Sequence, residues 1–124
     1  MKKYIELKNL EVYQISRQIS YQSWEIYQEM NWKHQKLIGD QFIRSADSVG
    51  ANIAEGYARF HDLDRARFYI IAKASLSEYG YHWLDLMYER QLLGQDHFNQ
   101  IRTLQKKLEI KLNNYISQTR KNAK

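Results

Sequence analysis

The chain has 124 residues, of which 44% are hydrophobic and 14% aromatic, a composition that suits one globular domain and excludes a disordered tail protein. It contains no cysteine, which excludes disulfides, cysteine-ligated zinc, iron–sulfur clusters and thiol nucleophiles. Its formal net charge is +5. The start of the chain does not resemble a signal peptide, and no apolar run approaches the ~18 residues of a membrane span. We therefore expect a cytoplasmic protein that does not contact membranes.

Long helices with few breaks are the main expectation for the fold, because proline is absent and glycine is sparse. Apolar residues recur at helical spacing over four segments, at about 9–30, 37–59, 63–93 and 96–116. Four long helices with short connections predict an all-α, up-and-down antiparallel four-helix bundle in a single domain spanning 1–124. Residues 117–124 are expected to form a basic C-terminal tail.

The third predicted helix carries two apolar faces, whereas a helix in a monomeric bundle buries one. One face contains Leu63, Ile70, Ala74, Ser77, Tyr81, Leu84 and Tyr88. The opposite face predicts self-association, because exposed apolar patches of that size usually mark partner surfaces. Its candidate interface residues are Phe68, Leu76, Tyr79, Trp83 and Leu86. The alternative is that the aromatic rings lie flat on the surface, partly covered by Arg and Lys stems.

Positive charge is concentrated near the C-terminus. From Arg102 onward the sequence has seven Lys or Arg residues and a single acid, Glu109. On a helical wheel these cations lie opposite the apolar stripe of the fourth helix, a pattern that favours contact with nucleic-acid phosphates. The candidate contacts are Arg102, Lys106, Lys107, Lys111, Arg120 and Lys121. Alternatively, these cations complement the helix dipole and keep the surface soluble. Aromatic residues do not interleave with this stripe, so base stacking on it is not expected.

No phosphate-binding glycine loop or serine-hydrolase motif occurs in the sequence. The most catalytic-looking cluster is Glu78, His82, Asp85 and Glu89 on one side of the third helix. A metal site in a bundle needs matching Glu and His sets on other helices, and the sequence has none. We therefore expect no metal, no cofactor and no enzymatic activity. A metal-dependent enzyme using Glu78 and His82 is the remaining alternative of this kind.

Residues 41–56, which include the run NIAEG at 52–56, carry a recognisable signature that continues through 71–78 and 10–14. The sequence resembles the bacterial four-helix-bundle proteins encoded by intervening sequences of large-subunit ribosomal RNA genes. These proteins are relatives of the accessory variability determinant of diversity-generating retroelements. Two positions depart from the family pattern: Gly50 stands where proline is frequent, and Ala74 stands where glycine commonly precedes Ser75.

The resemblance implies a homopentameric ring with basic surfaces, which in the retroelement relatives engage RNA and a reverse transcriptase. It carries over no catalytic residues. It assigns the residues of the matching segments to helix packing or assembly: Arg44, Asn52, Glu55, Gly56, Ser75 and Glu78. Gly56 would let a neighbouring backbone approach, and Asn52 would satisfy a buried polar group.

Together these observations predict a non-enzymatic, oligomeric accessory protein that binds structured RNA, in a ribosomal RNA intervening-sequence or retroelement-like context. The alternative is a scaffold that docks a protein partner through an aromatic surface and ignores nucleic acid. Tyr13, Trp24 and Tyr27 would form that surface on the first helix.

Overall fold

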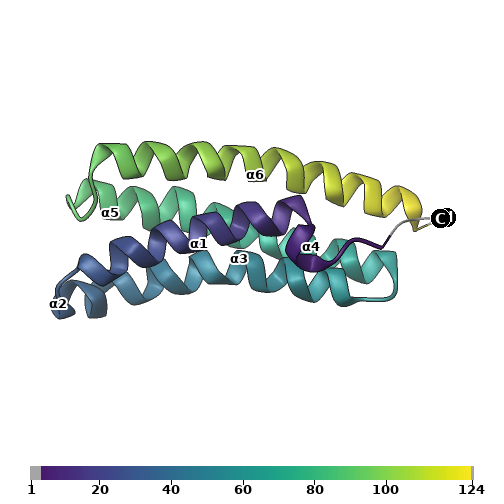
Figure 1. Cartoon of the computed structure of the whole chain (residues 1–124), viewed down its shortest axis with the longest axis horizontal. Helices are drawn as coiled ribbons and strands as arrows, with labels where there is room; N and C mark the ends of the chain where they lie inside the picture. The colour runs from purple at the N-terminus through teal and green to yellow at the C-terminus, as the bar shows by residue number, and fades with distance from the viewer. Residues whose placement is uncertain (1–3, 124) are drawn as a thin grey trace.

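The structure is a computed structural model that describes residues 4–123. Four long rods lie side by side (Figure 1). After the short η1 (Leu7–Asn9), the first rod is α1 (Glu11–Glu29), and the second joins α2 (Trp32–His34), η2 (Gln35–Gly39) and α3 (Asp40–Ala58). The third rod joins α4 (Asp62–Glu78), η3 (Tyr79–Leu84) and α5 (Asp85–Glu89), and the fourth is α6 (Gln95–Asn122). Because residues 4–123 form helices and no strands, the predicted four-helix bundle is confirmed.

Each rod packs against two neighbours, in the order α1, α3, α4, α6 and back to α1. The connections between rods are short, as at 59–61 between α3 and α4. In Figure 1 the turn between α3 and α4 lies at the same end of the bundle as the first described residues and the end of α6. This end therefore brings together three segments that are far apart in the sequence.

The core between the rods is made of aliphatic and aromatic side chains from all four of them. Phe42 of α3 stacks on Tyr79 of η3, with ring centroids 5.2 Å apart, and both residues are fully buried. The hydroxyls of Tyr79 and Ser23 share a hydrogen bond of 2.5 Å, so the phenol does not remain unsatisfied in an apolar interior. Within the described residues, no helix combines the length and apolar character needed to cross a membrane.

Three helix boundaries differ from the predicted ones. The predicted loop before residue 37 is helical, because α2 and η2 continue directly into α3. The third rod ends at Glu89 rather than near 93, since Gln91 adopts a left-handed backbone conformation with φ of 60°. Residues 117–122, predicted as a tail, are the last turns of α6. That stretch has no proline or glycine to stop the helix, and Ile116 holds it on the core.

Part of the two-faced pattern of the third rod is explained by η3, a π-helical segment between α4 and α5. One extra residue in such a turn rotates all later side chains by roughly 100° relative to an ideal helix. An ideal wheel therefore places Tyr79 and Leu84 on different faces, although both are fully buried in the core. The prediction that Leu76 and Tyr79 form an interface between copies is wrong, because neither has any exposed surface within the subunit.

The solvent-exposed surface of the third rod instead belongs to the first of the two predicted apolar faces, the one that contains Leu63, Ile70 and Tyr81. Leu63 is 68% exposed, Tyr81 49% and Ile70 39%. Ile71, also 39% exposed, extends this apolar surface. Of the residues predicted for an interface, Phe68, Trp83 and Leu86 are half-buried, so their contact with another copy stays a prediction.

Candidate nucleic-acid interface

The outward face of α6 carries four exposed cations: Lys106, Lys107, Arg120 and Lys121. Within residues 4–123 none of them forms an ion pair. No acidic residue follows Glu109 in the sequence, so the second half of the helix has no built-in counter-charge. We refer to these four residues as the cationic row.

Arg102 does not belong to this row, contrary to the prediction. Only 18% of its side chain is exposed, and it pairs with the carboxylate of Asp85. Its Nη2 also donates to the backbone oxygen of Gly80 at 3.1 Å, and the guanidinium lies over the Tyr81 and Phe98 rings. Arg102 therefore ties α6 to the third rod rather than facing solvent.

Lys111 is similarly engaged inside the subunit. Its Nζ lies 2.9 Å from a carboxylate oxygen of Glu11 on α1, and its side chain is 32% exposed. This ion pair offsets the charge that the sequence predicted for phosphate binding. A helical wheel could not detect it, because the partner is near the other end of the sequence.

Three of the six residues assigned to the family motif, Asn52, Gly56 and Ser75, lie where α3 meets α4. Ser48 and Ser75 share a hydrogen bond of 2.9 Å between their hydroxyls, and Asn52 Nδ2 donates to the Ser48 backbone oxygen at 2.8 Å. Asn52 is half-buried in this network, which agrees with its predicted role of satisfying polar groups. The motif therefore contributes to contact between helices within one subunit.

The two helices approach each other closely at Gly56. A Cβ atom there would lie 2.9 Å from Tyr69 Cε1, 3.0 Å from Phe68 Cβ and 3.1 Å from the backbone oxygen of Arg65. These distances are too short for any other residue without movement of α4. The predicted role of Gly56 in close backbone approach is confirmed.

The other three motif residues lie on the surface. Glu55 pairs with Arg59 at 2.6 Å, one turn further along α3. Glu78 accepts a hydrogen bond of 2.8 Å from Trp83 Nε1. Arg44 is exposed and makes no ion pair among residues 4–123. An assembly role for these three residues stays a prediction.

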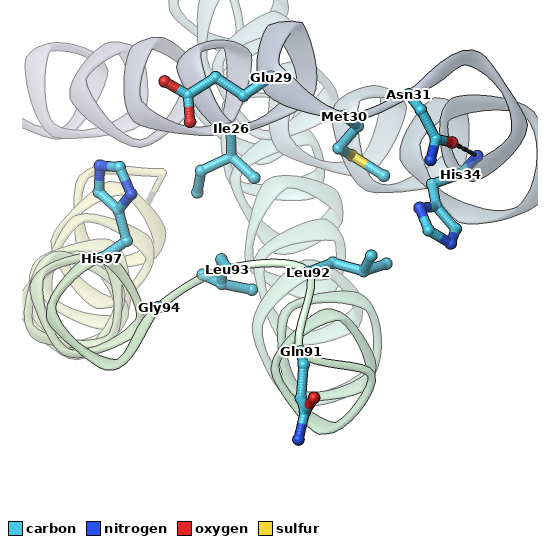
Figure 2. Close-up of a pocket in the computed structure, with 10 residues that line it drawn as sticks. All are labelled: Ile26, Glu29, Met30, Asn31, His34, Gln91, Leu92, Leu93, Gly94 and His97. Atoms are coloured by element: carbon cyan, nitrogen blue, oxygen red, sulfur yellow. Dashed lines mark hydrogen bonds between the residues drawn. The ribbon is translucent and has the colours of Figure 1, made fainter.

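A cavity of about 690 Å³ lies at the end of the bundle away from the α3–α4 turn (Figure 1). It is bounded by the end of α1, the start of α2 and the turn into α6. Figure 2 shows Glu29, His34 and His97 around it, together with Met30 and Leu92. Within residues 4–123, no three His, Asp or Glu side chains are grouped closely enough to hold a metal ion. The Glu78 and His82 pair considered in the sequence is therefore not part of such a group.

A cavity that the sequence did not indicate lies between the ends of α3 and α6 and the start of α4. Its volume is about 410 Å³, and Tyr57, Tyr69 and Tyr115 line it from these three helices. The Tyr69 and Tyr115 rings meet edge to face with centroids 6.2 Å apart. Burial raises the pKa of Tyr69 to about 12, although the nearby charge of Arg65 acts in the opposite direction.

The raised pKa of Tyr69 predicts a loss of stability in alkali. Its ordinary value is 10.0 and its folded value about 12, so its contribution is complete below pH 10 and is lost as the pH rises toward 12. In that range the free energy of unfolding should fall by about 1.4 kcal/mol per pH unit for this group. Tyr69→Phe should reduce the fall, as measured by urea unfolding at several pH values. Tyr4→Phe, at an exposed position, should not; equal slopes for all three proteins would contradict the prediction.

The fold and this surface together define a class: a small, basic, antiparallel four-helix-bundle protein. More specifically, the chain belongs to the 23S rRNA-intervening sequence protein family, whose model matches residues 8–114. The matched range contains Lys106 and Lys107, whereas Arg120 and Lys121 lie beyond it. A search of curated proteins found no match to the chain.

Proposed function

We propose that the protein is a non-catalytic accessory protein that binds structured RNA through the cationic row of α6 and acts as an assembly of several copies. The observation that carries the proposal is the row itself, in which exposed cations have no ion-pair partners within the described chain. Such residues bind phosphates and release counterions from the nucleic acid. The family description, which refers to 23S rRNA, makes RNA the favoured polyanion.

Binding through the row would depend on charge and shape rather than on base sequence. Lysines contact phosphates as point charges and do not read base edges. Several copies in one assembly would combine their rows and raise the affinity through multivalency. The exposed Leu63, Ile70 and Ile71 on α4 support self-association, and a homopentamer is the arrangement we propose.

Charge reversal on α6 tests the RNA proposal. Lys106→Glu with Lys107→Glu should weaken binding to a structured RNA by at least about tenfold near 0.1 M salt and lower the log–log salt slope by about 2. Fluorescence anisotropy against salt concentration measures both quantities. The matched control is Lys33→Glu with Arg44→Glu, which makes the same charge change on exposed residues of the second rod that also form no ion pair within residues 4–123, and it should have a smaller effect. Equal effects of the two double variants would contradict a site on α6.

A scaffold role remains the second candidate because α1 also presents aromatic surface. Trp24 is 47% exposed and stacks on Tyr27 at 5.4 Å, and Tyr21 is 65% exposed. Tyr13, predicted for the same surface, is half-buried beside a cavity of about 540 Å³. A protein partner, for example a reverse transcriptase, would then bind to this aromatic surface independently of RNA and of the cationic row. Nuclease treatment of a purified complex separates the two roles, since only a scaffold complex would survive it.

A further inference from the structure

The tyrosine-lined cavity lies between the ends of α3 and α6 and the start of α4. These three segments lie at one end of the bundle (Figure 1). Asn114 and Gln118 of α6 line it alongside the three tyrosines and Arg65. A second cavity, of about 660 Å³, shares Tyr57 and Arg65 with it and is also lined by Tyr4 and Phe60. The two cavities therefore adjoin at Tyr57 and Arg65.

The inside of the first cavity offers aromatic surface and unused polar atoms. Tyr69 is only 3% exposed, yet its hydroxyl forms no hydrogen bond with any residue of 4–123. Tyr57, in contrast, donates its hydroxyl to the backbone oxygen of Ile5. The Tyr69 hydroxyl oxygen is nevertheless not one of the fully enclosed side-chain atoms without a partner, so it is accessible from the cavity that Tyr69 lines. The Tyr69 hydroxyl can therefore donate a hydrogen bond to a polar, planar ligand in the cavity.

The charge around both cavities favours an anionic ligand. Among residues 4–123, no acid lines either one. Arg65 Nε donates to the Arg59 backbone oxygen at 2.7 Å, which holds the guanidinium in place, and its terminal N–H groups have no partner within residues 4–123. Two acids outside the linings, Asp62 and Glu11, raise the pKa of Tyr69 and Tyr115 respectively. Arg65 offsets the charge of Asp62 at Tyr69.

We propose that this cavity holds one unpaired base of the bound RNA, with the adjoining phosphate on Arg65. A volume of about 410 Å³ is ample for a nucleobase and lies in the ~300–1,000 Å³ range of small-ligand sites. The tyrosine rings supply a stacking surface, and the Asn114 and Gln118 amides supply hydrogen bonds to base edges. This inference rests on the proposed RNA function and adds to it a preference for unpaired strands, which the cationic row alone does not provide.

The test compares a blunt RNA hairpin with the same hairpin carrying a single-stranded uridine tail. The full chain should bind the tailed hairpin about tenfold to a hundredfold more tightly, because each stacked base contributes a factor of that order. Tyr115→Leu, which keeps apolar volume but removes the ring, should abolish the gain and leave the affinity for the blunt hairpin unchanged. Tyr21→Leu, an exposed tyrosine of α1, is the matched control and should keep the gain.

Crosslinking identifies the site directly. A tail containing 5-bromouridine should crosslink, on irradiation, to peptides that contain Tyr57 or Tyr115. Equal binding of both hairpins, with both weakened by the Lys106→Glu and Lys107→Glu variant, would overturn this inference and leave the proposed function intact. Binding of neither hairpin would overturn both. If Tyr115→Leu instead changes the mass in solution without affecting tail preference, the cavity is a contact between copies and the inference fails.

Discussion

Replacing Phe42 with alanine should lower the free energy of unfolding by about 3–5 kcal/mol, the cost usual for truncating a buried phenylalanine. Phe42 has no exposed surface, and its ring stacks on the equally buried Tyr79. The truncation removes apolar contacts and leaves a cavity at the centre of the bundle, beside the Ser23–Tyr79 hydrogen bond. Urea unfolding followed by circular dichroism measures the change.

Phe60→Ala is the matched control for this variant. Phe60 lies in the turn between α3 and α4 and is 89% exposed, so its truncation should change stability by less than about 0.5 kcal/mol. Similar losses for both variants would mean that Phe42 does not occupy the core described above. The comparison therefore tests the packing and not only the general sensitivity of the protein to losing an aromatic ring.

A methyl group at Gly56 should destabilise the protein by about 1–3 kcal/mol, the usual cost of overpacking. In an unobstructed helix interior, Gly→Ala would instead stabilise by roughly 0.5–1 kcal/mol. The sign reverses here because the new Cβ would lie 3.1 Å from the Arg65 backbone oxygen and 3.0 Å from Phe68 Cβ. Neither atom belongs to a flexible side-chain end, so α4 would have to move away from α3. Thermal and urea unfolding of Gly56→Ala measure the effect.

Gly94→Ser provides the contrasting case. No described atom lies within 4 Å of a Cβ built at residue 94, and the residue caps α6 without a side-chain hydrogen bond. Serine there offers an oxygen to the free N–H groups of the first turn, so this variant should be neutral or slightly stabilising. A stabilising effect of Gly56→Ala would contradict the close approach of α3 and α4.

The local pattern of apolar residues was sufficient to predict the helices, but it was not sufficient to predict which face of each helix is buried. The apolar repeats of α1 and α6 correspond to buried residues such as Ile19 and Leu108, because each helix keeps a regular 3.6-residue period. The third rod breaks that regularity at η3, which places Leu84 in the core with Tyr79. A wheel that assumes one period cannot detect the rotation, so it placed Leu84 on the face opposite Tyr79. Leu76 precedes η3, and there only the packing of the rods decided which of the two apolar faces is buried.

The candidate site, too, was predictable from the sequence only in part. The charge excess on α6 was visible in the sequence, and Lys106 and Lys107 are exposed as predicted. The sequence could not show that Arg102 and Lys111 differ from these free lysines, because their ion-pair partners Asp85 and Glu11 come from other rods. The tyrosine cavity had no sequence signal, because Tyr57, Tyr69 and Tyr115 are far apart in the chain and meet only when three helices pack.

Composition and periodicity by themselves determined that this protein is an all-helical bundle with its positive charge on the last helix. Both features depend on local chain chemistry: the absence of proline, the spacing of apolar residues and the order of Lys and Arg. Only the tertiary structure decided which apolar face is buried, which cations remain free and where a cavity opens. These properties depend on contacts between distant segments, whose partners are set by helix packing and by the π-helical turn of η3.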